Sequence, residues 1–162
     1  MAIDERETKR QRAVDGARLD DFDRTAFDDI ARAAAGVLGT PVGLVTVIDR
    51  DQQRFLGRIG TELEGTPRAI SFCDQAVEDP GRVLVIEDAS ADPRYADNPL
   101  VTGEHHIRFY AGAPLVSADG QALGTLCVLD VRPRQVDASQ IEQLRFLAEQ
   151  VMQTVSTRRR TG

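Results

Sequence analysis

The stretch RFYAGAPLV at residues 108–116, followed by SADG at 117–120 and ALGTLCVLD at 122–130, decides the fold of this 162-residue chain. Its two apolar runs are typical of strands, and the polar segment between them contains an Asp-Gly pair. Both residues of such a pair tolerate positive φ, which favours a tight reversal of the chain. The stretch therefore predicts two neighbouring antiparallel strands, near 106–116 and 121–130, joined by a hairpin.

Upstream of this hairpin, apolar residues recur at three- and four-residue steps between Leu19 and Val37, which predicts an amphipathic helix. Thr25 is its expected cap, and Gly39 with Pro41 is its expected end. The elements between this helix and the hairpin follow in chain order: a strand at 42–49, a turn at 50–51, a second strand at 53–59, a loop at 60–70, a short helix at 71–77, a third strand at 83–86 and a long connection at 87–104.

Downstream of the hairpin, Asp137 is expected to cap a last helix. Apolar side chains recur along this helix at alternating steps of three and four residues, as at the a and d positions of a coiled coil. We expect this seam to form the interface of a homodimer. Its residues are Ile141, Leu144, Ala148, Val151 and Val155.

The order of these elements predicts one α+β domain over residues 19–157, with helices at both ends and strands between them. Short turns between consecutive strands require an antiparallel sheet. We expect residues 1–18 to form a flexible or helical N-terminal extension. Residues 158–162, which begin with three arginines, are expected to form a basic C-terminal tail.

Composition and charge narrow the classes of function. The chain has 20 Lys and Arg against 26 Asp and Glu, which gives a formal net charge of −6. Because an acidic surface repels nucleic-acid phosphates, we expect no nucleic-acid partner. The chain contains no apolar run long enough for a membrane span and no signal sequence, so we expect no membrane partner and a cytoplasmic location. Cys73 and Cys127 are too few for a disulfide framework and are expected to be buried thiols.

Four motifs, SFC at 71–73, DASADPRY at 88–95, FYAGAPL at 109–115 and GTLCVLD at 124–130, together resemble the GAF domains of bacterial sensor kinases, diguanylate cyclases and regulatory phosphatases. The resemblance implies a GAF-like antiparallel sheet of five or six strands. The N- and C-terminal helices would pack on one face, and loops and a short helix would close a pocket on the other. The residues that it places in or near this pocket are Phe72, Cys73, Asp88, Tyr95, Leu100, Val101, Arg108, Phe109, Tyr110, Thr125 and Cys127.

The resemblance also implies a sensory or regulatory domain that binds a small molecule of unknown identity and signals through dimeric terminal helices. The sequence assembles no nucleophile, base and oxyanion site, so we expect no catalysis by this chain. The connection at 88–103 is the segment expected to reorder around a ligand. The output would then lie in a signalling partner or in a longer parent chain.

Two other functions are compatible with the same sequence. The heptad seam would equally suit a ligand-free dimerisation or scaffold module. Cys73, near the start of a short helix whose dipole favours a thiolate, would suit a thiol-based redox protein if Cys127 lay nearby. The role of Arg108 also stays open, because its guanidinium could hold an anionic ligand or pair with Asp88.

No metal, haem or bilin cofactor is expected. His105 and His106 are adjacent, so in a strand they would point to opposite faces, and no further ligand lies at a convincing metal spacing. Bilin-binding GAF domains generally attach their pigment through a cysteine close to a histidine. Cys73 and Cys127 lack that context.

Overall fold

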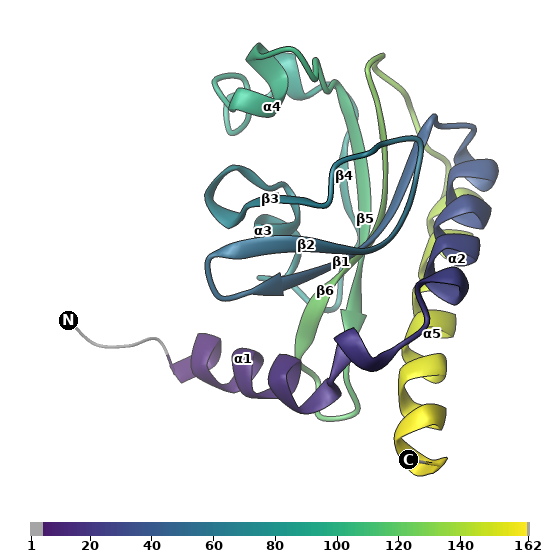
Figure 1. Cartoon of the computed structure of the whole chain (residues 1–162). Helices are drawn as coiled ribbons and strands as arrows, with labels where there is room; N and C mark the ends of the chain where they lie inside the picture. Colours follow the sequence, from purple (N-terminus) through teal and green to yellow (C-terminus); the bar gives the residue numbers. More distant parts are fainter. Residues whose placement is uncertain (1–4, 162) are drawn as a thin grey trace.

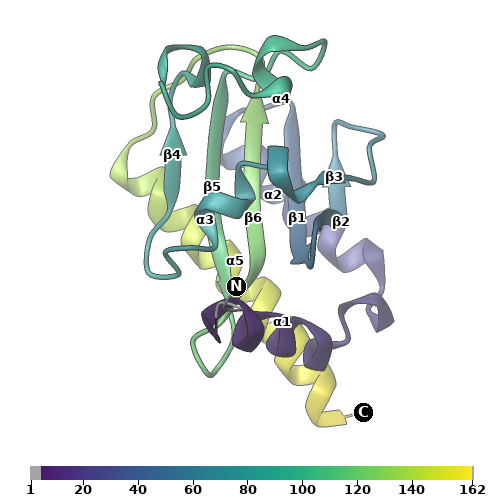
Figure 2. The same cartoon turned by 90° about the vertical axis from the view of Figure 1, so that its left-hand side faces the viewer.

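A six-stranded antiparallel sheet forms the centre of the computed structural model, which describes residues 5–161, from 157 onward by the backbone alone (Figures 1 and 2). The strand order is β3-β2-β1-β6-β5-β4. The strands are β1 (Val42–Asp49), β2 (Gln52–Ile59), β3 (Gly65–Pro67), β4 (Leu84–Ile86), β5 (Phe109–Val116) and β6 (Ala122–Asp130). The predicted α+β class and antiparallel sheet are confirmed.

The predicted hairpin lies in the middle of the sheet, where β6 pairs with both β1 and β5. Gly120 takes a φ of 86° in its turn, the conformation that glycine adopts without strain. β5 begins at Phe109 rather than near 106, because His106 has a φ of 54° and interrupts the extended backbone. The edge strand β3 falls inside the predicted loop at 60–70. Its Gly-Thr-Pro sequence is typical of a loop, and it becomes a strand by pairing with β2.

Two long helices cover one face of the sheet. α2 (Arg24–Leu38) and α5 (Ala138–Thr161) contact each other there, and α1 (Glu5–Ala17) crosses the lower end of the sheet in Figure 1. The short helices α3 (Cys73–Ala76) and α4 (Pro99–Thr102) lie in front of the opposite face (Figure 2). The described residues also include three 3-10 turns: η1 (Leu19–Asp21), η2 (Arg68–Ile70) and η3 (Ala89–Ala91). The predicted arrangement of terminal helices on one face is therefore present.

α2 begins at Arg24, later than the predicted start at Leu19. The Asp23 carboxylate accepts a hydrogen bond of 2.9 Å from the Thr25 N–H, so Asp23 holds the N-cap position that we expected for Thr25. Gly39 ends the helix in the left-handed conformation, with a φ of 69°, as predicted.

The core behind the sheet depends on a close approach of α2 to β1. Gly43 makes this possible, because a Cβ at that position would lie 2.2 Å from the Ala31 carbonyl oxygen. Large side chains such as Phe27, Phe109 and Leu126 are completely buried between the helices and the sheet. Each contributes about 1.5–3 kcal/mol by leaving water. This back core fixes α2 and α5 to the sheet.

α5 is capped as predicted but faces differently from our expectation. The Gln140 N–H donates to the Asp137 carboxylate over 2.8 Å, and the Gln140 side chain accepts from the Asp137 N–H. Four residues of the predicted dimer seam are at most 4% exposed within the single chain: Leu144, Ala148, Val151 and Val155. Ile141 is half-buried. The seam packs in the chain's own core, so it is not free to form the expected interface, and the homodimer itself stays a prediction.

α1 is tied to the rest of the domain by two arginines. Arg10 is 5% exposed and donates to the carbonyls of Ala122 and Leu123 over 3.3 and 3.4 Å. Glu7 accepts from Arg10 and from Arg68, each over 2.8 Å. Burial alone would raise the pKa of Glu7, but hydrogen bonds from these two guanidinium groups lower it to about 2. The N-terminal extension is thus helical over residues 5–17.

Residues 1–4 of the predicted extension lie outside the described residues. The predicted basic tail at 158–162 continues α5 as far as Thr161, and residue 162 lies outside the described part.

Candidate functional site

A cavity of about 250 Å³ opens on the face of the sheet opposite α2 and α5. We call it the front pocket. Its floor is formed by β1, β2, β5 and β6, and its cover by the segments around residues 60–66, 72–73 and 100–107. The lining residues are Val42, Leu44, Gln53, Phe55, Gly60, Thr61, Leu63, Thr66, Phe72, Cys73, Leu100, His105, Ile107, Tyr110, Cys127, Leu129 and Val131.

The lining of the front pocket is apolar and carries no permanent charge. None of its 17 described lining residues is Lys, Arg, Asp or Glu. Gln53 is the main polar group: it is 5% exposed, and its Nε2 donates to the Thr66 hydroxyl over 3.0 Å. Its Oε1 is buried without a hydrogen-bond partner. A buried acceptor left unpaired costs about 1–3 kcal/mol, which makes this amide the one lining side chain with an unused hydrogen-bonding atom among the described residues.

A cluster of thiol and hydroxyl groups lies at the base of the front pocket. The Cys73 Sγ lies 3.0 Å from the Thr125 Oγ1, 3.2 Å from the Tyr110 hydroxyl and 3.9 Å from the Cys127 Sγ. Burial raises the pKa of the Cys73 thiol, but hydrogen bonds from its neighbours outweigh burial and lower it to about 7. Burial raises the pKa of Cys127 well above its usual range. Both thiols thus belong to one buried, hydrogen-bonded cluster.

Tyr110 reaches this cluster because of the sequence around it. It points to the front of the sheet, and Gly112 follows two residues later on the same face. A Cβ at Gly112 would lie 2.1 Å from the Tyr110 hydroxyl oxygen, so the missing side chain leaves space for the ring. The Phe72 ring packs against Tyr110 with centroids 5.4 Å apart. The Phe-Tyr-Ala-Gly sequence thus directs the Tyr110 hydroxyl at Cys73.

Five of the eleven residues predicted for the pocket line it: Phe72, Cys73, Leu100, Tyr110 and Cys127. Three others lie next to it. Thr125 is fully buried beside the Cys73 thiol, and Tyr95 and Val101 belong to the apolar cluster on the same face of the sheet. The helix-dipole explanation for Cys73 has to be replaced, because α3 has only four residues and hydroxyl groups surround the thiol instead.

The other three predicted residues lie elsewhere. Phe109 points to the back core, since neighbouring residues of a strand face opposite sides. Arg108 donates to the carbonyls of Val101 and Ile107 over 3.0 and 3.1 Å and holds the connection in place. The Asp88 carboxylate caps η3 by accepting from the Ser90 N–H. The expected pair between Arg108 and Asp88 is therefore absent, and Arg108 is not among the residues that line the front pocket.

Twelve of the 17 lining residues were not predicted from the sequence, and Gln53, Phe55 and Thr66 are among them. Gln53 and Phe55 are two residues apart in β2, so alternation alone places them on one face. That signal was readable from the sequence. The position of Thr66 was not, because it depends on the pairing of β3 with β2, opposite Gln53.

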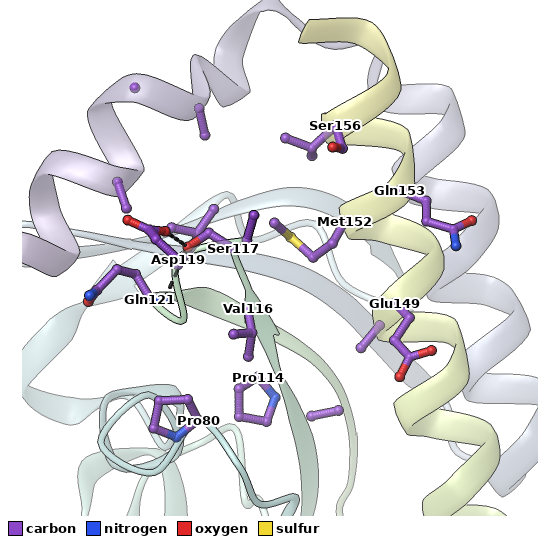
Figure 3. A pocket seen from close by; sticks show the side chains of 18 of the residues that line it. Pro80, Pro114, Val116, Ser117, Asp119, Gln121, Glu149, Met152, Gln153 and Ser156 are labelled. Atoms are coloured by element: carbon purple, nitrogen blue, oxygen red, sulfur yellow. Dashed lines mark hydrogen bonds between the residues drawn. The ribbon is translucent and has the colours of Figure 1, made fainter. Parts of the chain in front are cut away.

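A second concave surface, of about 980 Å³, lies between α1, α5 and the β5–β6 hairpin (Figure 3). We call it the side groove. Met152 and Ser156 of α5 lie across it from the hairpin residues Ser117 and Asp119, and Glu149 also belongs to its lining. Its lining mixes charges of both signs and carries no recognisable chemical constellation. It is a surface groove beside the terminal helices.

Two further features bear on cofactors and membranes. Within residues 5–156, no three His, Cys, Asp or Glu side chains are grouped so that they could hold a metal ion. None of the described helices combines the length and the apolar character needed to cross a bilayer.

Comparison with known proteins supplies the remaining observations. The family model for the GAF domain matches residues 24–155. A cyclic di-GMP phosphodiesterase of Pseudomonas aeruginosa is 42% identical over 160 residues, which cover 98% of this chain and 27% of that protein. The chain thus spans about a quarter of this relative's length.

Solved structures share the fold at lower sequence identity. The GAF domain of an Acinetobacter phosphoenolpyruvate-protein phosphotransferase has a TM-score of 0.69 at 14% identity and covers 99% of this chain and 98% of its own. A free methionine-R-sulfoxide reductase of Neisseria meningitidis, solved with its substrate, has a TM-score of 0.69 at 17% identity. The match covers 100% of this chain and 96% of the reductase chain.

Proposed function

Because this chain belongs to the GAF domain family, we propose that it is a regulatory module of a longer signalling protein and binds a small uncharged molecule in the front pocket. Family membership supports a sensory or regulatory domain. The 27% coverage of the Pseudomonas relative supports a place within a longer protein. Catalysis would then lie in another part of that protein, and cyclic di-GMP hydrolysis is the activity that the relative's name suggests for it.

The uncharged lining with one unused acceptor is the observation that carries the proposed ligand class. A cyclic nucleotide or a carboxylate would lose its hydration in a lining that contains no Lys or Arg and a single imidazole, that of His105. A neutral molecule with one N–H or O–H avoids this cost and pairs with the Gln53 Oε1. The volume of about 250 Å³ lies just below the roughly 300–1,000 Å³ of pockets for drug-sized ligands. A one- or two-ring compound fits these limits.

The fold supports a route from the front pocket to the terminal helices. Leu44 and Cys127 line the pocket from the front of β1 and β6, while Val45 and Leu126 pack on the back against the helices. A ligand that shifts these central strands would therefore bias the packing of α2 and α5. α5 runs to Thr161 and is the element that would carry the change toward a following domain. The expected homodimer would have to use surfaces other than the buried seam.

Isothermal titration with a matched pair of probes tests this proposal. Indole is neutral and carries one N–H donor, whereas benzofuran has nearly the same shape and an oxygen in place of that donor. We expect indole to bind roughly 2- to 10-fold more tightly than benzofuran, the value of one net hydrogen bond. The variant Gln53→Leu is expected to bind the two probes equally. Cyclic GMP should give no heat.

If the chain binds cyclic GMP but neither indole nor benzofuran, the proposed ligand class is overturned. Absence of binding by all three compounds, together with a stable dimer in solution, would favour the ligand-free scaffold instead.

A further inference from the structure

Cys73 and Cys127 come together although 54 positions separate them in the sequence. Both are free thiols, their sulfur atoms lie 3.9 Å apart, and both line the front pocket. A disulfide has an S–S length of about 2.05 Å, so the sulfurs must approach by about 2 Å to bond. Cys73 is at the first position of the four-residue helix α3, whereas Cys127 is fixed in the middle of β6. We therefore expect Cys73, rather than Cys127, to move when the two sulfur atoms approach each other.

Hydroxyl groups surround one sulfur more than the other. The Thr125 N–H donates to the Thr46 Oγ1 over 3.1 Å, and the Thr46 and Thr125 hydroxyls lie 3.1 Å apart. This chain of hydroxyls ends at the Cys73 Sγ, which the Tyr110 hydroxyl approaches from β5. A sulfur that accepts several hydrogen bonds is stabilised as the thiolate, the form that reacts with oxidants. These contacts favour Cys73 as the attacking thiol, and Cys127 is the nearest second thiol, 3.9 Å away.

We propose that Cys73 and Cys127 are a redox-active dithiol at the base of the front pocket, which a small uncharged hydroperoxide oxidises to an intramolecular disulfide. The Cys73 thiolate attacks one peroxide oxygen; the S–O bond forms, the O–O bond breaks, and the departing alkoxide or hydroxide takes up a proton. The Cys127 sulfur then attacks the Cys73 sulfenic acid, the S–S bond forms, and the hydroxyl leaves as water with the thiol proton. In total, two thiols and one hydroperoxide give a disulfide, an alcohol or water, and one further water.

The surroundings of the pair explain why the oxidant should be small and uncharged. Cys73 is 2% exposed and Cys127 is 1% exposed, and both line the front pocket, so a reagent in this pocket would lie next to them. The pocket lining has no charged side chain to accompany an ion. Bond formation would draw the start of α3 toward β6 and displace Phe72, the neighbouring lining residue. This chemistry does not require that the pocket binds a regulatory ligand.

Mass spectrometry after peroxide treatment tests the proposal. Reduced protein is incubated with hydrogen peroxide, then unfolded and alkylated with N-ethylmaleimide. We expect the folded chain to lose two hydrogen atoms in mass and to take up no alkylating reagent. Cys127→Ser should instead gain one or more oxygen atoms, because its sulfenic acid has no resolving thiol. Cys73→Ser should keep one alkylatable thiol. A folded wild-type chain that keeps two alkylatable thiols, or that bridges only between molecules, would overturn the proposal.

The pH dependence of oxidation gives a second readout that a purely structural cysteine would not show. The pKa of Cys73 is held at about 7, and the titratable groups that face it are Tyr110 and Cys127. The oxidation rate of the wild-type chain should rise through about pH 7 and level off above it. Tyr110→Phe removes one hydroxyl and should move this rise to higher pH while the chain stays folded. An unchanged pH profile in that variant would contradict the assigned role of the hydroxyl cluster.

Discussion

Replacing Gly112 by alanine is the sharpest test of how the thiol cluster is built. The new Cβ would lie 2.1 Å from the Tyr110 hydroxyl oxygen and 2.6 Å from the ring carbon that bears it. The ring cannot swing into solvent, since Tyr110 is 1% exposed and packs against Phe72. It must shift within the core and pull its hydroxyl away from Cys73.

The expected cost of Gly112→Ala combines two effects. Overpacking a core costs about 1–3 kcal/mol. Loss of the contact between the Tyr110 hydroxyl and the Cys73 sulfur adds about 0.5–1.5 kcal/mol. For a domain of this size, a change of 1 kcal/mol moves Tm by about 2–4 °C. We therefore expect a fall in Tm of roughly 3–18 °C.

Thermal unfolding followed by circular dichroism measures this effect, and two variants serve as controls. Gly36→Ala places a methyl where no atom lies within 4 Å, inside α2, and should stabilise the chain by about 0.5–1 kcal/mol. In the double variant with Tyr110→Phe, the atom nearest to the new methyl is gone, so the two changes should cost less together than their sum. An unchanged Tm for Gly112→Ala, or strict additivity in the double variant, would refute this account of the Tyr110 position.

Three further predictions concern the helices. Val151→Glu places a charge in the back core and should cost about 3–5 kcal/mol, lowering Tm at any protein concentration, whereas the exposed control Gln153→Glu should change little. The pKa of Glu7 is lowered in the folded chain, so the ionised Glu7 stabilises the fold above its ordinary pKa of 4.5, and this stabilisation is lost as the pH falls toward about 2. The difference in urea midpoint between the wild-type chain and Glu7→Gln should therefore shrink over that range. The exposed Glu5→Gln serves as the control. Asp23→Ala removes the α2 cap and should destabilise by about 1 kcal/mol in the same assay; a neutral result would contradict the capping geometry.

Local sequence signals predicted those elements whose causes are themselves local. Three of these signals each determine the backbone within a few residues of their own position: the Asp-Gly turn, the helix end at Gly39 and the helix cap at Asp137. The start of β5 was placed too early, because the interruption at His106 is a backbone conformation without a residue type that announces it. Propensity also missed β3, which exists only as the neighbour of β2.

The candidate site was harder to predict because it depends on which face of each element turns inward. Alternation separated Phe109 from Tyr110 but could not say which of the two points to the front. The apolar seam of α5 has the same spacing whether it meets a second chain or the sheet of its own chain, and Val151 lies against the sheet. The approach of Cys73 to Cys127 joins α3 to β6, so no short stretch of sequence contains it.

The two borders of the sheet limit how this domain associates. β3 and β4, which occupy them, have three residues each, and β3 ends in a proline that has no N–H to donate. An incoming strand would find few unpaired backbone groups on either side, so fibre-like growth by strand addition is disfavoured. Contact between copies of the domain would then be left to the helices.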